Sequence, residues 1–370
     1  MSARAGGADQ AVADLPVSGP GASTVRARAR PSPATRARGR GGALARGAAV
    51  AAACLLAALA ATWPLALNLS TAIPQGAEHE ATVPVFSLWG LWWTADRAAD
   101  GLAGYWDAPF FHPARGVTTY SEPFPLVGLA VAPLWALDLP PALIYNTALL
   151  ALLALNGAFG YRLARALGSA AVPALLGGLL TVLLPFVSKV EGALPLAAIF
   201  GIPWTLEGLV HFGRGGATRW AAWAAAGLVA TYLTCQQYAL LFAPLALAAG
   251  LVALGQRRFA PGSARRLLGA ALGAALILAP VALPGLRVHA QAGFSRPEAL
   301  VEALSARPGD FLTRPELALV GVPPADGSDT GGLFPGALLL ALALAGTVVG
   351  ARDPAARRWT LYLAASAVVA

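Results

Sequence analysis

The stretch GAAVAAACLLAALAATWPLALN, residues 47–68, decides the fold of this chain. It carries no charged side chain and is as long as the roughly 20 residues that a helix needs to cross a bilayer. Lipid offers no hydrogen-bond partners to the backbone, so a segment of this kind must cross as a helix. It is too long for the apolar core of a signal peptide, and we expect it to be retained.

The rest of the chain repeats this character. Its 370 residues are 57% hydrophobic and 12% charged, which is about half the charged fraction of a soluble domain. A last apolar run begins after Arg358, where only 12 residues remain. We therefore predict an all-α polytopic membrane protein with about eight complete spans and a partial last one, truncated at its C-terminus. After the first span, the predicted spans are 142–161, 170–186, 194–212, 219–234, 237–255, 267–286 and 335–350.

The polar segments divide the chain further. Residues 1–46 are rich in Gly, Ala, Pro and Arg without an apolar period, which predicts a disordered basic cytoplasmic tail. Residues 47–370 form the predicted membrane domain. Within it, residues 69–141 and 287–334 are the two large predicted extracytoplasmic loops.

The placement of basic residues predicts the topology. The net charge is +8, but the arginines fall in the tail and in short clusters between apolar runs, which argues against a nucleic-acid partner. Such clusters are typical of cytoplasmic loops, so we expect a multi-pass protein of the cell (inner) membrane with a cytoplasmic N-terminus. If the short stretch Leu126–Leu137 were a span, 11 of 19 cytoplasmic basic residues would move outside. We therefore predict that this stretch is an interfacial or re-entrant helix.

The first loop holds most of the candidate chemistry. Its sequence STAIPQGAEHEATVPVFSLWGLWWTADRAADGLAGYWDAPFFHPARGVTTY covers residues 70–120 and contains two of the four histidines and four of the ten tryptophans. Residues Val83–Ala99 read as a helix with Phe86, Trp89 and Trp93 along one side. A helix of this kind is expected to lie in the membrane interface.

Three polar clusters are candidate site residues. Glu78-His79-Glu80 could bind a divalent cation or deprotonate a sugar hydroxyl, or simply solvate a loop. Arg115 suits a phosphate, because its guanidinium is planar, but it could equally form a surface ion pair. Lys189, the only lysine and close to Glu191, could meet a lipid phosphate or extend toward water from the membrane edge.

Several function classes are disfavoured. The chain has no P-loop, dinucleotide-binding fingerprint, GxSxG motif or Cys/His cluster, which argues against an ATPase, an oxidoreductase and a serine hydrolase. Cys54 and Cys235 sit in or beside apolar runs and are expected to be small core residues.

The order of these features resembles that of the bacterial integral-membrane glycosyltransferases of the C-type fold, which use polyprenyl-phosphate sugars and include mannosyl- and aminoarabinosyl-transferases. The resemblance covers roughly residues 58–350. It is carried by Thr62-Trp-Pro-Leu65, WGLWW at 89–93, Phe111-His-Pro-Ala-Arg-Gly116, Tyr120-Ser-Glu122 and Tyr161-Arg-Leu-Ala-Arg165.

The resemblance implies a catalytic acidic residue shortly before the aromatic helix, commonly an aspartate. That position is Val83 here, so Glu80 becomes the candidate general base, with Glu78 in reserve. His112, Arg115 and Glu122 would line the site, and Lys189 is a further substrate-binding candidate. No cofactor is certain, although a divalent cation remains a candidate.

The expected function is therefore transfer of a sugar from a polyprenyl-phosphate donor to an extracytoplasmic glycan, lipid or protein acceptor, with membrane lipids as further partners. Two alternatives stay open. One is a transporter or flippase of lipid-linked sugars, which predicts ionisable residues inside the spans. The other is a non-catalytic membrane assembly component, favoured by the missing aspartate.

Overall fold

The computed structural model describes residues 33–76, 82–293, 295–303, 305–307, 309, 311, 333–354 and 356–369. All regular secondary structure in these ranges is helical, which confirms the all-α class. The chain divides into two units, residues 1–45 and 46–370. Residues 1–32 of the predicted tail and about half of the predicted loop 287–334 lie outside the described residues.

Four helices are long and apolar enough to cross a membrane. They are Leu44–Ala61, which belongs to α1 (Pro33–Ala61), α4 (Pro141–Leu167), α9 (Gln236–Gln256) and α10 (Pro261–Ala292). Such helices are typical of a membrane protein. The remaining predicted spans correspond to shorter helices, so the number of about eight stays a prediction. These are α5 (Ala171–Val182), α7 (Gly201–Gly215), α8 (Thr218–Thr234) and α12 (Ala337–Arg352), and α13 (Arg357–Val369) follows.

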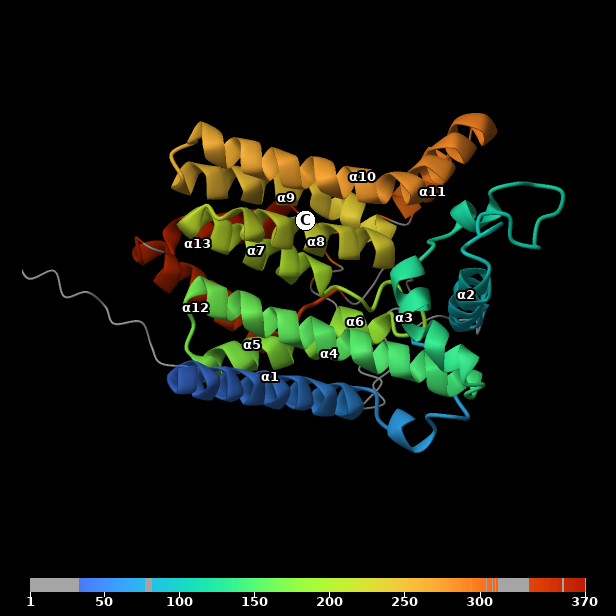
Figure 1. The fold of residues 1–370 in the computed structure, drawn as a ribbon, viewed down its shortest axis with the longest axis horizontal. Helices are drawn as coiled ribbons and strands as arrows, with labels where there is room; N and C mark the ends of the chain where they lie inside the picture. Colours follow the sequence, from blue (N-terminus) through green and yellow to red (C-terminus); the bar gives the residue numbers. More distant parts are fainter. Residues whose placement is uncertain are drawn as a thin grey trace, which may run out of the picture. The chain divides into compact units, whose positions relative to one another are not determined.

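The interior helices run side by side, with α7 packed against α4, α8 and α9 (Figure 1). Small residues allow the close approach of α7 and α8. A Cβ on Gly208 would lie 2.6 Å from the backbone nitrogen of Ala224, and one on Gly227 would lie 2.6 Å from that of Thr205. Small residues at helix contacts are a common packing device in membranes, because they bring two backbones together.

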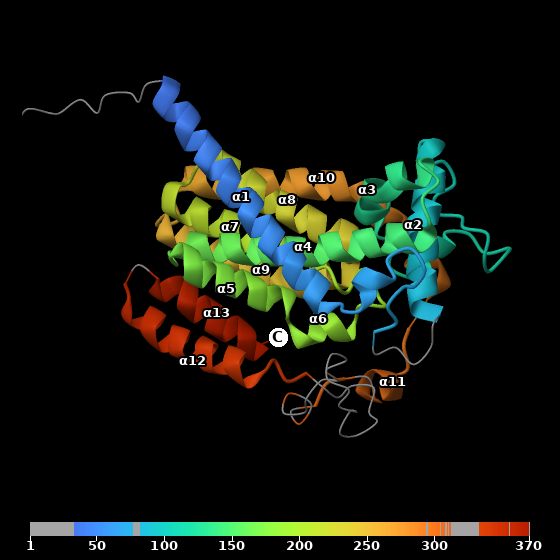
Figure 2. The same ribbon diagram turned by 90° about the horizontal axis from the view of Figure 1, so that it is seen from below.

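The helix α2 (Thr82–Ala99) lies across the ends of the long helices (Figure 2). It begins one residue before the helix predicted from Val83. It packs on α3 (Pro125–Ala136), which matches the short apolar stretch and contains Pro133. Between them lie an irregular segment and the short 3-10 helix η2 (Val117–Tyr120).

One predicted span differs clearly from the structure. The helix expected over 194–212 begins only at Gly201, and residues 190–200, which follow the short helix α6 (Pro185–Lys189), are irregular. Most of these irregular residues are nevertheless buried. A buried irregular backbone requires hydrogen-bond partners from the surrounding protein, and these partners are part of the site described below.

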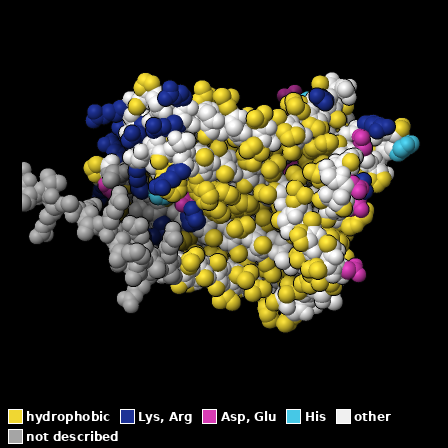
Figure 3. Space-filling model, viewed as in Figure 1, with side chains coloured by type: hydrophobic (Ala, Val, Ile, Leu, Met, Phe, Trp, Pro, Cys, Tyr) yellow, Lys and Arg dark blue, Asp and Glu magenta, His cyan; other side chains and the backbone are white. Residues whose placement is uncertain are grey.

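Charge is distributed unevenly along the helices. Figure 3 shows Lys and Arg gathered at one end of an apolar band, with most of the visible Asp and Glu toward the other end. Contacts hold the basic end together: Arg266 Nη1 donates to the carbonyl of Gly216 at 2.8 Å, and Trp359 Nε1 donates to Gln256 Oε1 at 3.2 Å. The arginines of this end are Arg162, Arg165, Arg214, Arg219, Arg257, Arg258, Arg265, Arg266, Arg352, Arg357 and Arg358.

Candidate functional site

The end of the helices opposite the arginines gathers loop segments that are distant in sequence. The side chain of Asn146, near the start of α4, donates to the carbonyls of Leu69 at 2.9 Å and Ala72 at 2.7 Å. These bonds fix the chain that follows the first apolar helix against α4. The start of the first predicted loop is therefore an ordered part of this end.

The irregular residues 190–200 are held by side chains from α4 and α9. The Tyr145 hydroxyl lies 3.0 Å from the carbonyl of Glu191 and 3.1 Å from that of Gly192, and donates to them. Asn156 donates to the carbonyl of Ala197 at 2.8 Å and accepts from the backbone N–H of Ile199 at 3.0 Å. The Tyr238 hydroxyl donates to the carbonyl of Leu196 at 2.7 Å. Polar side chains thus replace the hydrogen bonds that a continuous helix would have made.

Two glycines allow these segments to touch. A Cβ on Gly192 would overlap the carbonyl oxygen of Gln75, and one on Gly76 would lie 2.8 Å from the carbonyl oxygen of Lys189. Gly76 also has φ +68°, a conformation that favours glycine. We call this backbone contact between Gln75–Gly76 and Lys189–Gly192 the seam. The Ser87 hydroxyl of α2 donates to the carbonyl of Gly192 at 3.5 Å. The aromatic helix α2 therefore also contacts the seam.

The predicted catalytic residues Glu78 and Glu80, with His79, lie outside the described residues, in the interval 77–81. The flanks of that interval are described: Gly76 belongs to the seam, and α2 begins at Thr82. Lys189, predicted to meet phosphate, ends α6 with its carbonyl at the seam. Among the described residues, no group of three or more His, Cys, Asp or Glu side chains is placed to hold a metal ion, so the divalent cation stays a prediction.

Glu191 is a half-buried acid at the seam. No hydrogen bond or ion pair to its carboxylate is found among the described residues. Burial raises the pKa of this carboxyl from 4.5 to about 7, because a low-dielectric environment disfavours the charged form. Near neutral pH a substantial share of this carboxyl is therefore protonated.

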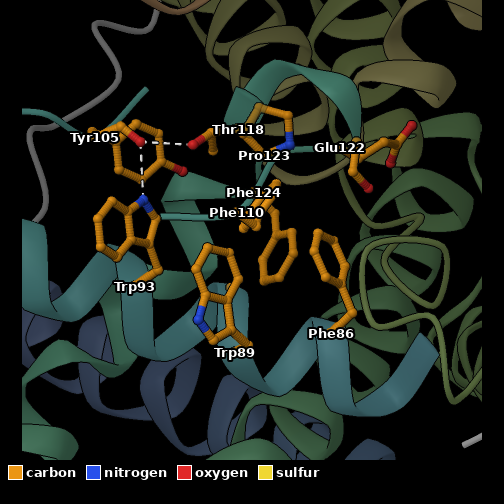
Figure 4. Close-up of a pocket in the computed structure, with 11 residues that line it drawn as sticks. Phe86, Trp89, Trp93, Tyr105, Phe110, Thr118, Glu122, Pro123 and Phe124 are labelled. Carbon is orange, nitrogen blue, oxygen red and sulfur yellow. Dashed lines mark hydrogen bonds between the residues drawn. The ribbon is translucent and has the colours of Figure 1, made fainter. Parts of the chain in front are cut away.

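An aromatic pocket lies on another side of α2 (Figure 4). Trp89 and Trp93 stack with ring centroids 5.6 Å apart, and Phe110 meets Trp89 edge-on at 5.1 Å. Trp93 Nε1 and the Thr118 hydroxyl both donate to the carbonyl of Tyr105, at 2.9 and 2.8 Å. The pocket volume of about 20 Å³ admits about one water molecule. A sugar ring would enter only if the aromatic walls moved.

Glu122 lines this pocket, but its carboxylate points away from the rings (Figure 4). It accepts the backbone N–H of Gln237 at 2.9 Å and the thiol of Cys235 at 3.1 Å. Burial and the neighbouring Glu122 carboxylate raise the pKa of the Cys235 thiol. In this conformation, the predicted substrate-binding residue Glu122 caps the first turn of α9.

His112 and Arg115 lie in an exposed turn of the same segment. Arg115 forms an ion pair with Asp107 at 3.4 Å, and its side chain is 87% exposed. The other carboxylate oxygen of Asp107 accepts the backbone N–H of Gly116 at 2.8 Å. Arg115 therefore forms a surface ion pair with Asp107, which is one of the two roles that the sequence allowed for it.

A separate ion pair joins the interior helices and involves one buried carboxylate. Arg162 Nε and Nη2 donate to the two carboxylate oxygens of Glu207 at 3.0 and 2.9 Å, and Trp223 Nε1 donates to the same carboxylate at 3.2 Å. The Glu207 side chain is only 5% exposed. Glu207 lies within the predicted span 194–212, and its partner Arg162 is 45 positions away in the sequence.

Comparison of the chain with protein-family models, with curated proteins and with solved structures found no match. The case for a function accordingly rests on the seam, the aromatic helix α2 and the distribution of charge.

Proposed function

We propose that this protein is a membrane glycosyltransferase that moves a sugar from a polyprenyl-phosphate donor to an extracytoplasmic acceptor. The seam is the observation that carries the proposal. It places the backbone leading to Glu78 and Glu80 against the segment that carries Lys189 and Glu191, at the helix ends covered by α2 (Figure 2). Lys189 and Glu191 thus lie on a segment that touches the chain just before the proposed base.

The topology proposed for this function follows from charge. Because basic residues favour the cytoplasmic side, we place the arginine-rich end in the cytoplasm, together with the N-terminus. The protein then crosses the inner membrane about eight times, and the seam faces the extracytoplasmic side. The side chains of α10 are largely exposed, so the isoprenoid tail of a donor has an apolar surface along which to lie.

The proposed reaction uses Lys189 of the seam and the carboxylates that follow Gly76 in the sequence. Glu80, with Glu78 in reserve, accepts the proton of the acceptor hydroxyl as its oxygen attacks the anomeric carbon of the donor sugar. The bond from that carbon to the phosphate oxygen breaks, and polyprenyl phosphate leaves with the electron pair. Lys189 offsets the charge that develops on the phosphate.

The test is a transfer assay in membranes that contain the full chain. The donors are labelled polyprenyl-phosphate mannose and aminoarabinose, and the readout is label that leaves the lipid fraction. We expect Glu80→Gln to lower transfer by about 10²-fold or more, the usual contribution of a general base. Glu298→Gln, a change at an exposed carboxylate of α11 (Glu298–Ala303), is the matched control. Full activity in both Glu80→Gln and Glu78→Gln would show that the proposed base is wrong.

The ion pair between Arg162 and the buried Glu207 favours a second candidate, a transporter or flippase of lipid-linked sugars, because ionisable groups inside a membrane often line a pathway. A flip assay with a fluorescent polyprenyl-phosphate sugar in proteoliposomes separates the two functions. A transporter moves the intact lipid and loses this activity in Glu207→Gln. A glycosyltransferase leaves the lipid on its original side.

A further inference from the structure

Glu191 is the described acidic residue at the seam, and its position is fixed from two directions. The Tyr145 hydroxyl binds the carbonyls of Glu191 and Gly192, while the backbone nitrogen of Glu191 would lie 3.2 Å from a Cβ on Gly76. The backbone that carries the carboxyl is thus held in place, although the carboxyl itself has no hydrogen-bond partner among the described residues. A carboxyl on a fixed backbone, without a described hydrogen-bond partner, is suited to bind a ligand or to transfer a proton to it.

The surroundings of Glu191 favour a neutral carboxyl. Tyr145 faces it from α4, Ser87 approaches its neighbour Gly192 from α2, and Lys189 precedes it on α6. Burial raises the pKa of Glu191 to about 7. Glu78, His79 and Glu80 follow Gly76 in the chain and lie outside the described residues. A neutral carboxyl can approach a phosphate without repulsion and can donate to it.

We propose that Glu191 is the proton donor to the polyprenyl phosphate that leaves during sugar transfer. This inference rests on the proposed function. When the carbon–oxygen bond of the donor breaks, the phosphate oxygen retains the electron pair and takes the proton of Glu191. The general base of the proposed function takes the proton of the acceptor hydroxyl, and both groups return to their first states by exchange with water. A general acid and a general base can divide the proton transfers of one reaction in this way.

The first experiment follows the protonation of Glu191 in the full-length wild-type protein. N,N′-dicyclohexylcarbodiimide is an apolar reagent that reacts with protonated carboxyl groups, and mass spectrometry locates its adducts. We expect labelling of Glu191 at pH 6 that falls about tenfold for each pH unit above 7. We also expect polyprenyl phosphate without a sugar to slow this labelling at least fivefold. Glu298 is the internal reference carboxyl, and Glu191→Gln shows that the adduct is correctly assigned.

The second experiment measures the pH dependence of transfer. A proton donor works below its pKa, so wild-type transfer should fall as the pH rises through about 7. In Glu191→Gln we expect transfer at pH 6 to fall by about 10²-fold and the decline with pH to disappear. Glu191→Asp keeps an acid and should restore part of the activity if the Gln variant folds poorly.

The outcomes separate this inference from the proposed function. Labelling of Glu191 that ignores pH or polyprenyl phosphate overturns the inference, as does unchanged transfer in Glu191→Gln. Absence of transfer by the wild type from every donor overturns the proposed function and the catalytic role with it. Labelling then still reports whether Glu191 meets polyprenyl phosphate, so the two failures are distinguishable.

Discussion

Glu122 joins parts of the chain that are distant in sequence, because its carboxylate accepts hydrogen bonds from Gln237 and Cys235. We expect Glu122→Ala to lower stability by about 1–3 kcal/mol, since it removes a helix cap and leaves a buried thiol without its acceptor. Glu122→Gln keeps one acceptor oxygen and should lose less. Thermal midpoints in detergent measure both effects, with Glu298→Ala as control. Unchanged midpoints would contradict a capping role.

The raised pKa of Glu191 has a consequence for stability that needs no substrate. Between pH 4.5 and 7 the folded state holds this proton more tightly than the unfolded state, so stability decreases as pH rises through that window. Glu191→Gln removes the cost of ionisation. We expect the stability of the variant relative to the wild type to be greater at pH 8 than at pH 5. The difference should be less than about 3 kcal/mol, because the group is only half-buried. Thermal midpoints at pH 5 and pH 8 measure this. A stability difference between variant and wild type that is equal at pH 5 and pH 8 would contradict the raised pKa of Glu191.

At the scale of elements, the seam depends on two glycines. Gly192→Ala would place a methyl group on the carbonyl of Gln75, and overpacking of this kind costs about 1–3 kcal/mol. We expect it to lower both the thermal midpoint and the proposed sugar transfer. The matched control is Gly250→Ala within α9, where nothing lies within 4 Å of an added Cβ, and that change should be neutral or slightly stabilising. If the two variants behaved alike, the seam would not be a tight contact.

Hydropathy predicts most of the helices well. The runs 219–234 and 237–255 correspond closely to α8 (Thr218–Thr234) and α9 (Gln236–Gln256), because a long apolar run in lipid has few alternatives to a helix. The predicted span 194–212 begins seven residues before the helix α7 (Gly201–Gly215). Its first part is irregular and held by Asn156 and Tyr238, and no local pattern reveals partners that come from other helices.

The candidate site was less predictable than the helices for the same reason. The sequence identified the aromatic helix and the carboxylates that surround it. It did not show that Glu122 would cap α9 or that Tyr145 would hold the backbone of Glu191. These roles depend on contacts between segments far apart in the chain. The proposed base Glu80 and the metal remain predictions.

At the scale of the whole molecule, the unequal distribution of charge makes a topology testable. Cys54 and Cys235 are both buried, so an impermeant maleimide should give little background in intact cells. We expect the exposed variant Ala103→Cys, in the first loop, to react from outside. Ala170→Cys and Ala264→Cys, at the arginine-rich end, should react only after the cells are opened. Labelling of all three from outside would mean that α3 crosses the membrane.

The hydrogen bond from Ser87 to Gly192 spans 105 residues of sequence, and this separation sets the order of events during synthesis. At about 5–20 residues per second, the segment ending at Gly76 and the start of α2 emerge roughly 5–20 seconds before their partner on the ribosome. The early part of the chain must wait in the membrane, unpaired, until the residues after α6 are made. The seam therefore forms late in biogenesis. A chain whose synthesis ends between α2 and α6 would contain its first helix and Gly76 but not Lys189 or Gly192, so the seam could not form.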